Sequence, residues 1–201
     1  MTVPLPAVTD SVEHIAEALL TAAEAKDFRI RAHSERVARY CLEIAEKMGL
    51  DEEARHHLKL GALLHDIGNI GIPDSILLKP AGLSQWEFEE TKMHTLIGVQ
   101  ICKPVASLSG ALPLIRSHHE RLDGSGYPDS LKGDAISPAA RILAVVDVYD
   151  TLRCDRAYRS AFAHDDAMEI LQSEVAKGWW QAEIVDMVGE LSAPQDDFAP
   201  V

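Results

Sequence analysis

The chain has 201 residues, of which 47% are hydrophobic, so it is long enough for one compact core and short for two full domains. Its formal net charge of −13 argues against binding to duplex nucleic acid, which needs a strongly basic face. The sequence shows no signal peptide and no run approaching the roughly 18 apolar residues of a membrane span. We therefore expect a cytoplasmic protein of one domain that makes no membrane contact.

The first part of the chain carries the signals of three helices. Ala, Leu and Glu residues with an apolar stripe predict the first helix over Asp10–Lys26. A second helix is predicted over Ala32–Met48, where Gly49 provides a C-terminal cap. Asp51 is a typical N-cap for a third helix, which is predicted to end at the sequence HDIG, residues 65–68.

Shorter and longer helices follow. The stretch 74–79 predicts a minor helix that Pro80 ends, and Ser84 forms a capping box with Glu87 at the start of a helix that runs on to Cys102. Glycine, aspartate and proline residues predict a loop over 121–136. Later helices are predicted at Leu112–Glu120, Pro138–Cys154, Asp165–Lys177 and Gln181–Leu191.

The alternation typical of β-strands is hard to find in this chain. The elements therefore predict an all-α fold, a single-domain helical bundle of about seven to nine helices. We expect residues 1–25 to form an N-terminal helix, residues 26–192 the main domain and residues 193–201 a flexible tail.

Several ionisable side chains stand in apolar helical segments. Asp147 lies in PAARILAVVDVYDTL, which is apolar on nearly all faces, and an isolated buried carboxylate costs several kcal/mol unless it is paired or coordinated. The same question arises at His65, Asp66, His94, His118 and His119. Imidazoles and carboxylates on separate helices are the means by which helical bundles build two-metal sites.

Each of these residues, taken alone, also has a structural explanation. A single histidine near an apolar face is about three times more often a core residue with satisfied hydrogen bonds than a metal ligand. We keep that explanation for His14, His56, His57 and His164. Asp150 and Asp155 are explained as helix-end charges or hydrogen-bond partners. The remaining set is too large for chance burial and is predicted to bind metal: His33, His65, Asp66, His94, His118, His119 and Asp147.

Together, these motifs resemble a known family. The segments AHSERVA, LLHDIGNIGIPDSILLKP, MHTLIG, HHERLDGSGYPDSLKG and ARILAVVDVYDTL followed by DRAYR are similar to the HD-GYP family of metal-dependent phosphohydrolases, within the HD superfamily. The resemblance covers roughly Lys26–Phe162, and Gly126, Tyr127 and Pro128 are its GYP element. It implies hydrolysis of the bacterial second messenger cyclic di-GMP to linear pGpG, and in some members onward to GMP.

The resemblance also implies a binuclear centre of divalent metals, iron or manganese. One ion would be bound by His33, His65, Asp66 and Asp147. The other would be bound by Asp66, His94, His118 and His119, so that Asp66 bridges the two. Such ions polarise a phosphodiester and activate a bridging hydroxide for in-line attack. The ligand types alone are compatible with manganese, iron or zinc.

Substrate contacts are implied for the GYP element and for the segment after Asp147. By resemblance, Gly126 and Tyr127 would lie against the bound nucleotide. Arg156 and Arg159 would bind its phosphate or guanine, because a guanidinium pairs bidentately with phosphate oxygens. The alternative for these two arginines is pairing with surface acids.

Two positions depart from the family pattern. Asn69 stands where family members commonly have a lysine that assists catalysis; an amide donates a hydrogen bond without charge, and losing one such donor costs roughly 10²- to 10³-fold in rate. Asp66 and Asn69 are accordingly the predicted catalytic residues. Arg29 replaces a glutamate that holds a third metal in some members, and arginine cannot ligate a cation, so we predict two metals.

The sequence leaves three functions open. The first is a cyclic di-GMP phosphodiesterase whose activity Asn69 reduces or tolerates. The second is a catalytically weak or inactive module that binds a nucleotide or a protein partner. The third is a phosphohydrolase for another nucleotide. A homodimer or a signalling-protein partner is compatible with each of them.

Overall fold

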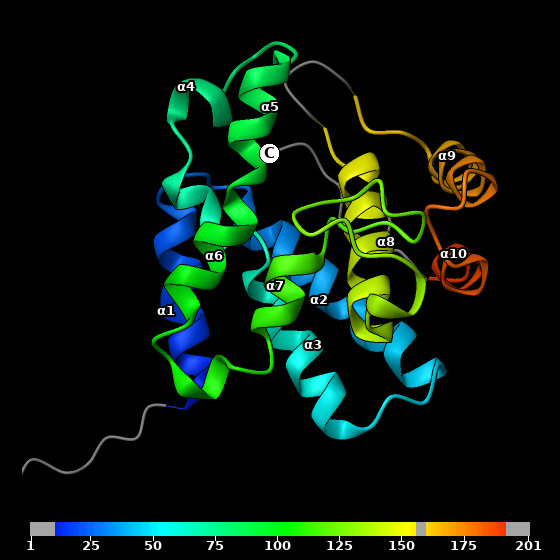
Figure 1. The fold of residues 1–201 in the computed structure, drawn as a ribbon, viewed down its shortest axis with the longest axis horizontal. Helices are drawn as coiled ribbons and strands as arrows, with labels where there is room; N and C mark the ends of the chain where they lie inside the picture. The colour runs from blue at the N-terminus through cyan, green and yellow to red at the C-terminus, as the bar shows by residue number, and fades with distance from the viewer. Residues whose placement is uncertain (1–10, 156–159, 192–201) are drawn as a thin grey trace, which may run out of the picture.

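The computed structural model describes residues 11–155 and 160–191, and every regular element in these residues is a helix (Figure 1). The α-helices are α1 (Val12–Glu24), α2 (Ile30–Lys47), α3 (Glu52–Leu64), α4 (Asp74–Leu77), α5 (Gln85–Lys92), α6 (His94–Cys102), α7 (Leu112–Ser117), α8 (Pro138–Arg153), α9 (His164–Ala176) and α10 (Ala182–Gly189). Short 3₁₀ helices are η1 (Ile67–Gly71), η2 (Ala106–Leu108) and η3 (Gly133–Ala135). The predicted all-α fold is confirmed.

The helix ends follow the capping residues of the sequence. The side chain of Asp51 accepts a hydrogen bond of 2.8 Å from the backbone of Ala54, and Gly49 closes α2 with a φ of 70°. Both hydrogen bonds of the capping box between Ser84 and Glu87 are present at the start of α5. The exception is the helix predicted to run on to Cys102, which is divided at Met93 into α5 and α6.

The core consists of two apolar clusters that share α3. One joins α2, α3 and α8 with the C-terminal helices, and it includes Leu58 and Val146. The other joins α1, α3 and η1 with the α6–α7 region, and it includes Leu60, Leu64 and Ile115. Helix α3 packs against α1, α2, α7 and α8, and the η1 segment that follows it packs against α6.

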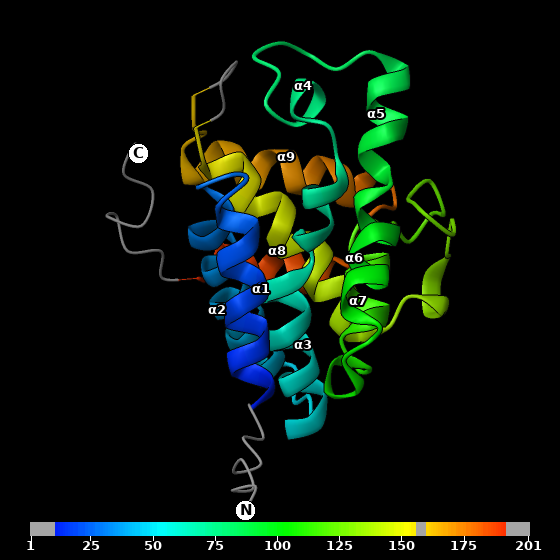
Figure 2. The same ribbon diagram turned by 90° about the vertical axis from the view of Figure 1, so that its left-hand side faces the viewer.

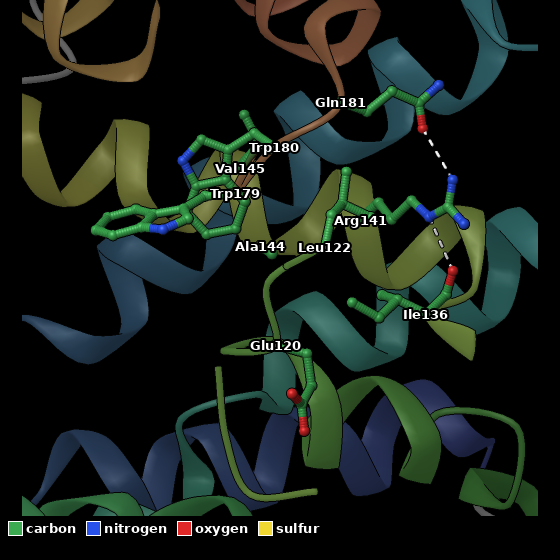
Figure 3. A pocket seen from close by; sticks show the side chains of 9 residues that line it. All are labelled: Glu120, Leu122, Ile136, Arg141, Ala144, Val145, Trp179, Trp180 and Gln181. Carbon is green, nitrogen blue, oxygen red and sulfur yellow. Dashed lines mark hydrogen bonds between the residues drawn. The ribbon is translucent and has the colours of Figure 1, made fainter. Parts of the chain in front are cut away.

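The loop between α7 and α8 is attached to the C-terminal part of the bundle. The backbone N–H of Leu122 donates to the carbonyl of Trp179 at 3.0 Å, and the guanidinium of Arg121 lies 3.5 Å from the centre of the Trp179 ring. A small pocket here is lined by Glu120, Leu122, Ile136, Arg141, Ala144, Val145, Trp179, Trp180 and Gln181 (Figure 3). None of the seven predicted metal ligands lines it, so we assign the pocket to the support of this loop.

Helices α4 and α5 project from one end of the bundle (Figure 2). Helix α5 exposes two large apolar side chains, Trp86 and Phe88, and Leu78 and Leu83 are exposed between the two helices. Among the described residues, no helix combines the length and apolar character needed to cross a membrane.

Candidate metal centre

The centre forms where the segment after α3 meets the start of α6. Gly68 lies so close to α6 that an added Cβ would be 1.9 Å from the carbonyl oxygen of His94 and 2.6 Å from the backbone nitrogen of Gly98. Only glycine allows this approach, whatever its backbone angles. The glycine of HDIG therefore allows the side chains of Asp66 and His94 to lie close together, with Oδ1 of Asp66 3.5 Å from Nε2 of His94.

The first group of potential ligands is His33, His65 and Asp66, whose ligand atoms lie within 4.8 Å of one another. The Nδ1–H of His33 donates to Asp150 at 2.7 Å, and the Nδ1–H of His65 donates to the carbonyl of Ala62 at 2.8 Å. Both rings consequently turn Nε2 inward, and the two Nε2 atoms are 3.2 Å apart. This is the arrangement in which an outer hydrogen bond fixes the tautomer of a metal-binding histidine.

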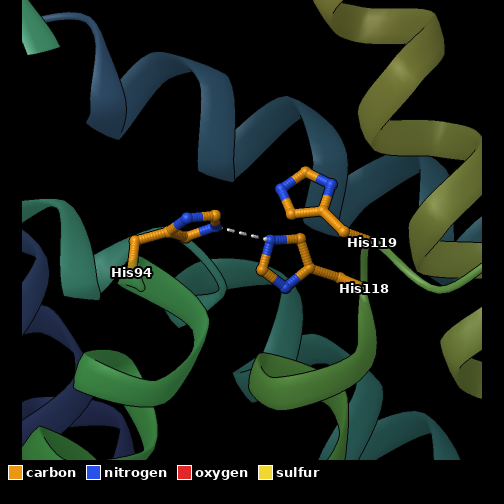
Figure 4. A group of neighbouring side chains, drawn as sticks. All are labelled: His94, His118 and His119. Atoms are coloured by element: carbon orange, nitrogen blue, oxygen red, sulfur yellow. Dashed lines mark hydrogen bonds between the residues drawn. The ribbon is translucent and has the colours of Figure 1, made fainter. Parts of the chain in front are cut away.

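The second group is His94, His118 and His119, whose imidazoles face one another (Figure 4). The Nδ1–H of His94 donates to the carbonyl of Thr91 at 2.6 Å, and that of His118 donates to the carbonyl of Ile115 at 2.9 Å. Since a carbonyl only accepts, each neutral ring carries a lone pair on Nε2, and these two atoms are 3.2 Å apart. Two facing acceptors are stabilised when a cation lies between them, so this donor set fits a metal ion.

Two carboxylates connect the groups. Asp66 places Oδ2 3.6 Å from Nε2 of His65 and Oδ1 3.5 Å from Nε2 of His94. Asp147 places Oδ1 3.2 Å from Nε2 of His33 and Oδ2 4.0 Å from Nδ1 of His119. The seven side chains predicted as ligands thus meet at one place, from five different helices or helix ends.

The two groups differ in proton affinity. Burial alone would lower the pKa of His33, but the hydrogen-bonded carboxylates of Asp147 and Asp150 outweigh it and raise this pKa to about 10. Burial also opposes protonation of His65, and neighbouring carboxylates again outweigh it and raise the pKa. By contrast, burial and the surrounding histidines hold the pKa of His118 well below its ordinary value. His33 and His65 of the first group therefore bind a proton more readily than His118 of the second group.

Asp150 adjoins the candidate site, although the sequence analysis did not assign it there. It is completely buried and accepts from Nδ1 of His33, and its hydrogen bonds from Arg36 measure 2.7 and 2.9 Å. One of the two explanations given for Asp150, a hydrogen-bond partner, is thus confirmed. A signal existed, because Asp150 follows Asp147 by three residues and so lies on the same side of α8.

Glu120 is a second residue that the sequence did not assign. Only 1% of it is exposed, and its carboxylate accepts backbone hydrogen bonds from Asp129 at 2.7 Å and from Leu131 at 3.0 Å. These donors follow the GYP element directly. Glu120 therefore fixes the loop, and its only sequence signal was its position next to two histidines that are predicted ligands.

The GYP element covers the second group. A Cβ at Gly126 would be 2.5 Å from the backbone of His119, Glu120 and Arg121, so a glycine is required for the loop to fold back onto this segment. The backbone N–H of Tyr127 donates to the carbonyl of His119 at 3.2 Å, and the two rings are 4.7 Å apart at 33°. Tyr127 thus forms a wall of the centre, and burial together with the charges of Asp147 and Asp66 raises its pKa.

The remaining predicted residues are placed less directly. Asn69 lies within η1, three residues after Asp66, and is partly exposed. Arg29 forms a bidentate ion pair with Asp27, at 2.9 and 2.8 Å. Arg156 and Arg159 lie outside the described residues, so their predicted contacts stay predictions.

This fold and ligand set define a family. The model of the HD domain family matches residues 17–184, most of the chain, and the chain therefore belongs to that family. The more specific resemblance to HD-GYP proteins, drawn from the motifs, is confirmed by curated relatives that are named as cyclic di-GMP phosphodiesterases.

Three similarities illustrate this relationship. The chain is 42% identical over 159 residues to the cyclic di-GMP phosphodiesterase response regulator RpfG of Xanthomonas campestris, covering 78% of this chain and 42% of the relative. It is 34% identical over 179 residues to 3'3'-cGAMP-specific phosphodiesterase 1 of Vibrio cholerae, covering 89% and 42%. The solved structure of Bd1817, an HDG"Y"P protein from Bdellovibrio bacteriovorus, matches with a TM-score of 0.67 at 20% identity, covering 88% of this chain and 59% of that chain. The chain spans less than half of the length of the two curated relatives.

Proposed function

We propose that the protein is a metal-dependent phosphodiesterase that hydrolyses cyclic di-GMP to linear pGpG, and onward to GMP if the linear product is accepted. The observation that carries this proposal is the position of Asp66. Its two carboxylate oxygens face two separate groups of histidines, at 3.6 and 3.5 Å. Two ligand groups that share one carboxylate are the arrangement by which proteins hold paired ions for phosphoryl chemistry.

The proposed cofactors are two divalent ions, iron or manganese. The first group with Asp147 would hold one ion, and the second group with Asp66 the other. When bound, such ions supply the charge that polarises a phosphodiester and acidifies water. The inward Nε2 atoms and their outer hydrogen bonds to Ala62, Thr91 and Ile115 support this assignment.

The residues of the chain have distinct parts in the proposed hydrolysis, in which a water oxygen bonds to phosphorus while the bond from phosphorus to a ribose oxygen breaks. Asp66 and Asp147 remain ionised, because the facing histidines lower the pKa of both carboxyls in spite of burial. Asn69 would donate a hydrogen bond to a phosphoryl oxygen as negative charge develops. Gly126, which lets the loop fold back onto the segment of His119, would allow Tyr127 to lie against the nucleotide. Arg156 and Arg159 would hold a phosphate or guanine.

The test is anaerobic incubation of the purified protein with cyclic di-GMP after separate loading with manganese and with ferrous iron, followed by chromatography of the products. We expect pGpG or GMP only in metal-loaded samples. Asp66→Ala should lose both the metal and the turnover. Turnover at the wild-type rate in the Asp66→Ala protein would overturn the proposal.

A second substrate has support of its own, because the relatives include a 3'3'-cGAMP-specific phosphodiesterase at 34% identity. The same incubation with 3'3'-cGAMP and cyclic di-AMP in place of cyclic di-GMP decides between them. The substrate with the highest kcat/KM shows which two nucleobases the site prefers.

The other alternative is a module that binds the nucleotide without hydrolysing it. Asn69 supports this alternative, because it replaces the lysine that family members commonly have. Tight cyclic di-GMP binding without turnover under every metal and redox condition would favour it. In that case Asn69→Lys should restore turnover, since one charged donor to the developing anion is worth roughly 10²- to 10³-fold. The cytoplasmic location, the domain limits and the homodimer or protein partner stay predictions.

A further inference from the structure

One face of α5 lies against the wall of the metal centre. The ring of Phe88 is 6.3 Å from the ring of Tyr127, edge-on at 84°. The ammonium of Lys92, one turn later on the same face, lies 4.9 Å from the Phe88 ring and 5.4 Å from the Tyr127 ring. Because Tyr127 itself stacks on His119, a cation and two aromatic rings adjoin the second ligand group.

Lys92 differs from the other cations near the centre in what holds it. Arg36 binds the buried carboxylate of Asp150, and Lys26 donates to the carbonyls of Ile70 and Ile72 at 2.8 and 2.5 Å. Lys92 instead pairs at 2.7 Å with Glu89, and the two side chains are 26% and 56% exposed. Exposed pairs of this kind contribute little, so the ammonium can exchange Glu89 for another anion at small cost.

The contacts with Tyr127 and Lys92 leave a large part of Phe88 exposed. It is 46% exposed although it stands beside the centre, and α5 buries none of its residues. Any nucleobase can stack on such a ring, because every base has a π-face, and an ammonium binds a phosphate as a point charge. A cyclic dinucleotide carries both groups next to the phosphodiester that is cut, since it has two bases and two phosphates.

We propose that Phe88 and Lys92 form a substrate-binding surface, in which Phe88 and Tyr127 hold a nucleobase and Lys92 binds a phosphate of the cyclic dinucleotide. This inference rests on the proposed function and adds two residues to it. Lys92 would supply a positive charge that Asn69 does not bring.

The experiment compares Lys92→Met, Lys92→Arg and Phe88→Leu with the wild type and with Lys103→Met, a matched lysine at the far end of α6. Steady-state kinetics are measured on the manganese-loaded proteins with cyclic di-GMP and with bis(p-nitrophenyl) phosphate, which lacks purines and a second phosphate. Binding of cyclic di-GMP is measured separately by calorimetry. Melting curves verify that each variant is folded.

We expect Lys92→Met to raise KM or Kd for cyclic di-GMP roughly tenfold or more, because one charged hydrogen bond is lost. Lys92→Arg should stay within about threefold of the wild type, and Phe88→Leu should weaken binding at least about fivefold through lost stacking. In Lys92→Met and in Phe88→Leu, the decrease in kcat/KM should be larger with cyclic di-GMP than with bis(p-nitrophenyl) phosphate.

The outcomes separate this inference from the proposed function. Turnover of cyclic di-GMP with KM and Kd unchanged in Lys92→Met and Phe88→Leu overturns the inference and leaves the function in place. Binding without turnover, weakened in both variants, overturns the function and supports the binding surface. Failure of the wild type to bind cyclic di-GMP overturns both.

Discussion

The two groups of potential ligands, which form the two halves of the candidate metal centre, use the same residue types in different surroundings. In the first half, His33 is oriented by the buried carboxylate of Asp150, which Arg36 in turn holds. In the second half, His94 and His118 are oriented by main-chain carbonyls, and no carboxylate orients these rings. His65 of the first half also donates to a main-chain carbonyl, so the difference lies at His33, whose orientation depends on a side-chain network that a single substitution can remove. The other half is fixed by the helix ends themselves.

The largest effects are expected from removing one ligand from each half. His33→Ala and His118→Ala should each reduce the metal content from two ions per chain to about one, with turnover at least about 100-fold lower, because loss of a ligand exceeds loss of an outer partner. Metal content is measured by mass spectrometry and turnover with cyclic di-GMP. His56→Ala, which changes a histidine outside both groups, is the control. Two ions retained in His118→Ala would contradict the second half as a metal site.

The asymmetry itself is tested at Asp150. Asp150→Asn should weaken binding of one ion by about 10- to 100-fold, since outer partners of ligating histidines typically contribute that much. The other ion should keep its affinity, because its histidines are oriented by carbonyls. Competition with a metal-sensitive dye resolves the two affinities. The matched control is Asp134→Asn, an exposed partner of Arg141, and equal weakening of both ions would refute the asymmetry.

A smaller effect is expected at the loop that covers the second half. Glu120→Ala leaves the backbone N–H groups of Asp129 and Leu131 without their acceptor, which should lower the free energy of unfolding by about 2 kcal/mol. Glu120→Gln keeps one acceptor oxygen and should lose less. Urea denaturation measures both. If both ions stay bound while KM for cyclic di-GMP rises, Glu120 acts through Tyr127 and not through the metals.

The smallest effect is expected at the cap of α5. Ser84→Ala removes the side-chain acceptor for the backbone of Glu87 and should cost about 1 kcal/mol in thermal or urea unfolding. Both ions should remain bound, because α5 contributes no ligand. Loss of an ion in this variant would mean that metal content follows general stability and that the ligand variants above report nothing specific.

The sequence predicted the helices well wherever local chemistry sets their limits. Asp51, Gly49 and the pair Ser84 with Glu87 act within one turn of the chain, and each cap is present in the structure. The division at Met93 could not be predicted in this way. The residues around it form helix readily, and the start of α6 is where Gly68 packs, a contact with a segment 26 positions earlier in the chain.

The candidate site could also be predicted in part: the sequence indicated the potential ligands but not the residues that support them. The seven predicted ligands could be selected because buried imidazoles and carboxylates in apolar helices need a partner, and in the structure these seven side chains lie together. Asp150 and Glu120 could not be assigned in the same way. Their carboxylates act on His33 and on a loop nine to eleven residues further along, and those pairings exist only after the helices have packed.

The contact of Gly68 with His94 also changes how sequences of this family can be sorted. The glycine of HDIG is required by the close packing of Gly68 against the start of α6. Its own backbone angles do not require a glycine. In a chain that keeps all seven predicted ligands but carries alanine at this position, the methyl group would clash with the carbonyl of His94. The segment of Asp66 and the start of α6 could then not approach each other as closely as they do here. A comparison that considers only the histidines and aspartates would therefore overlook the residue on which the approach of the two groups depends.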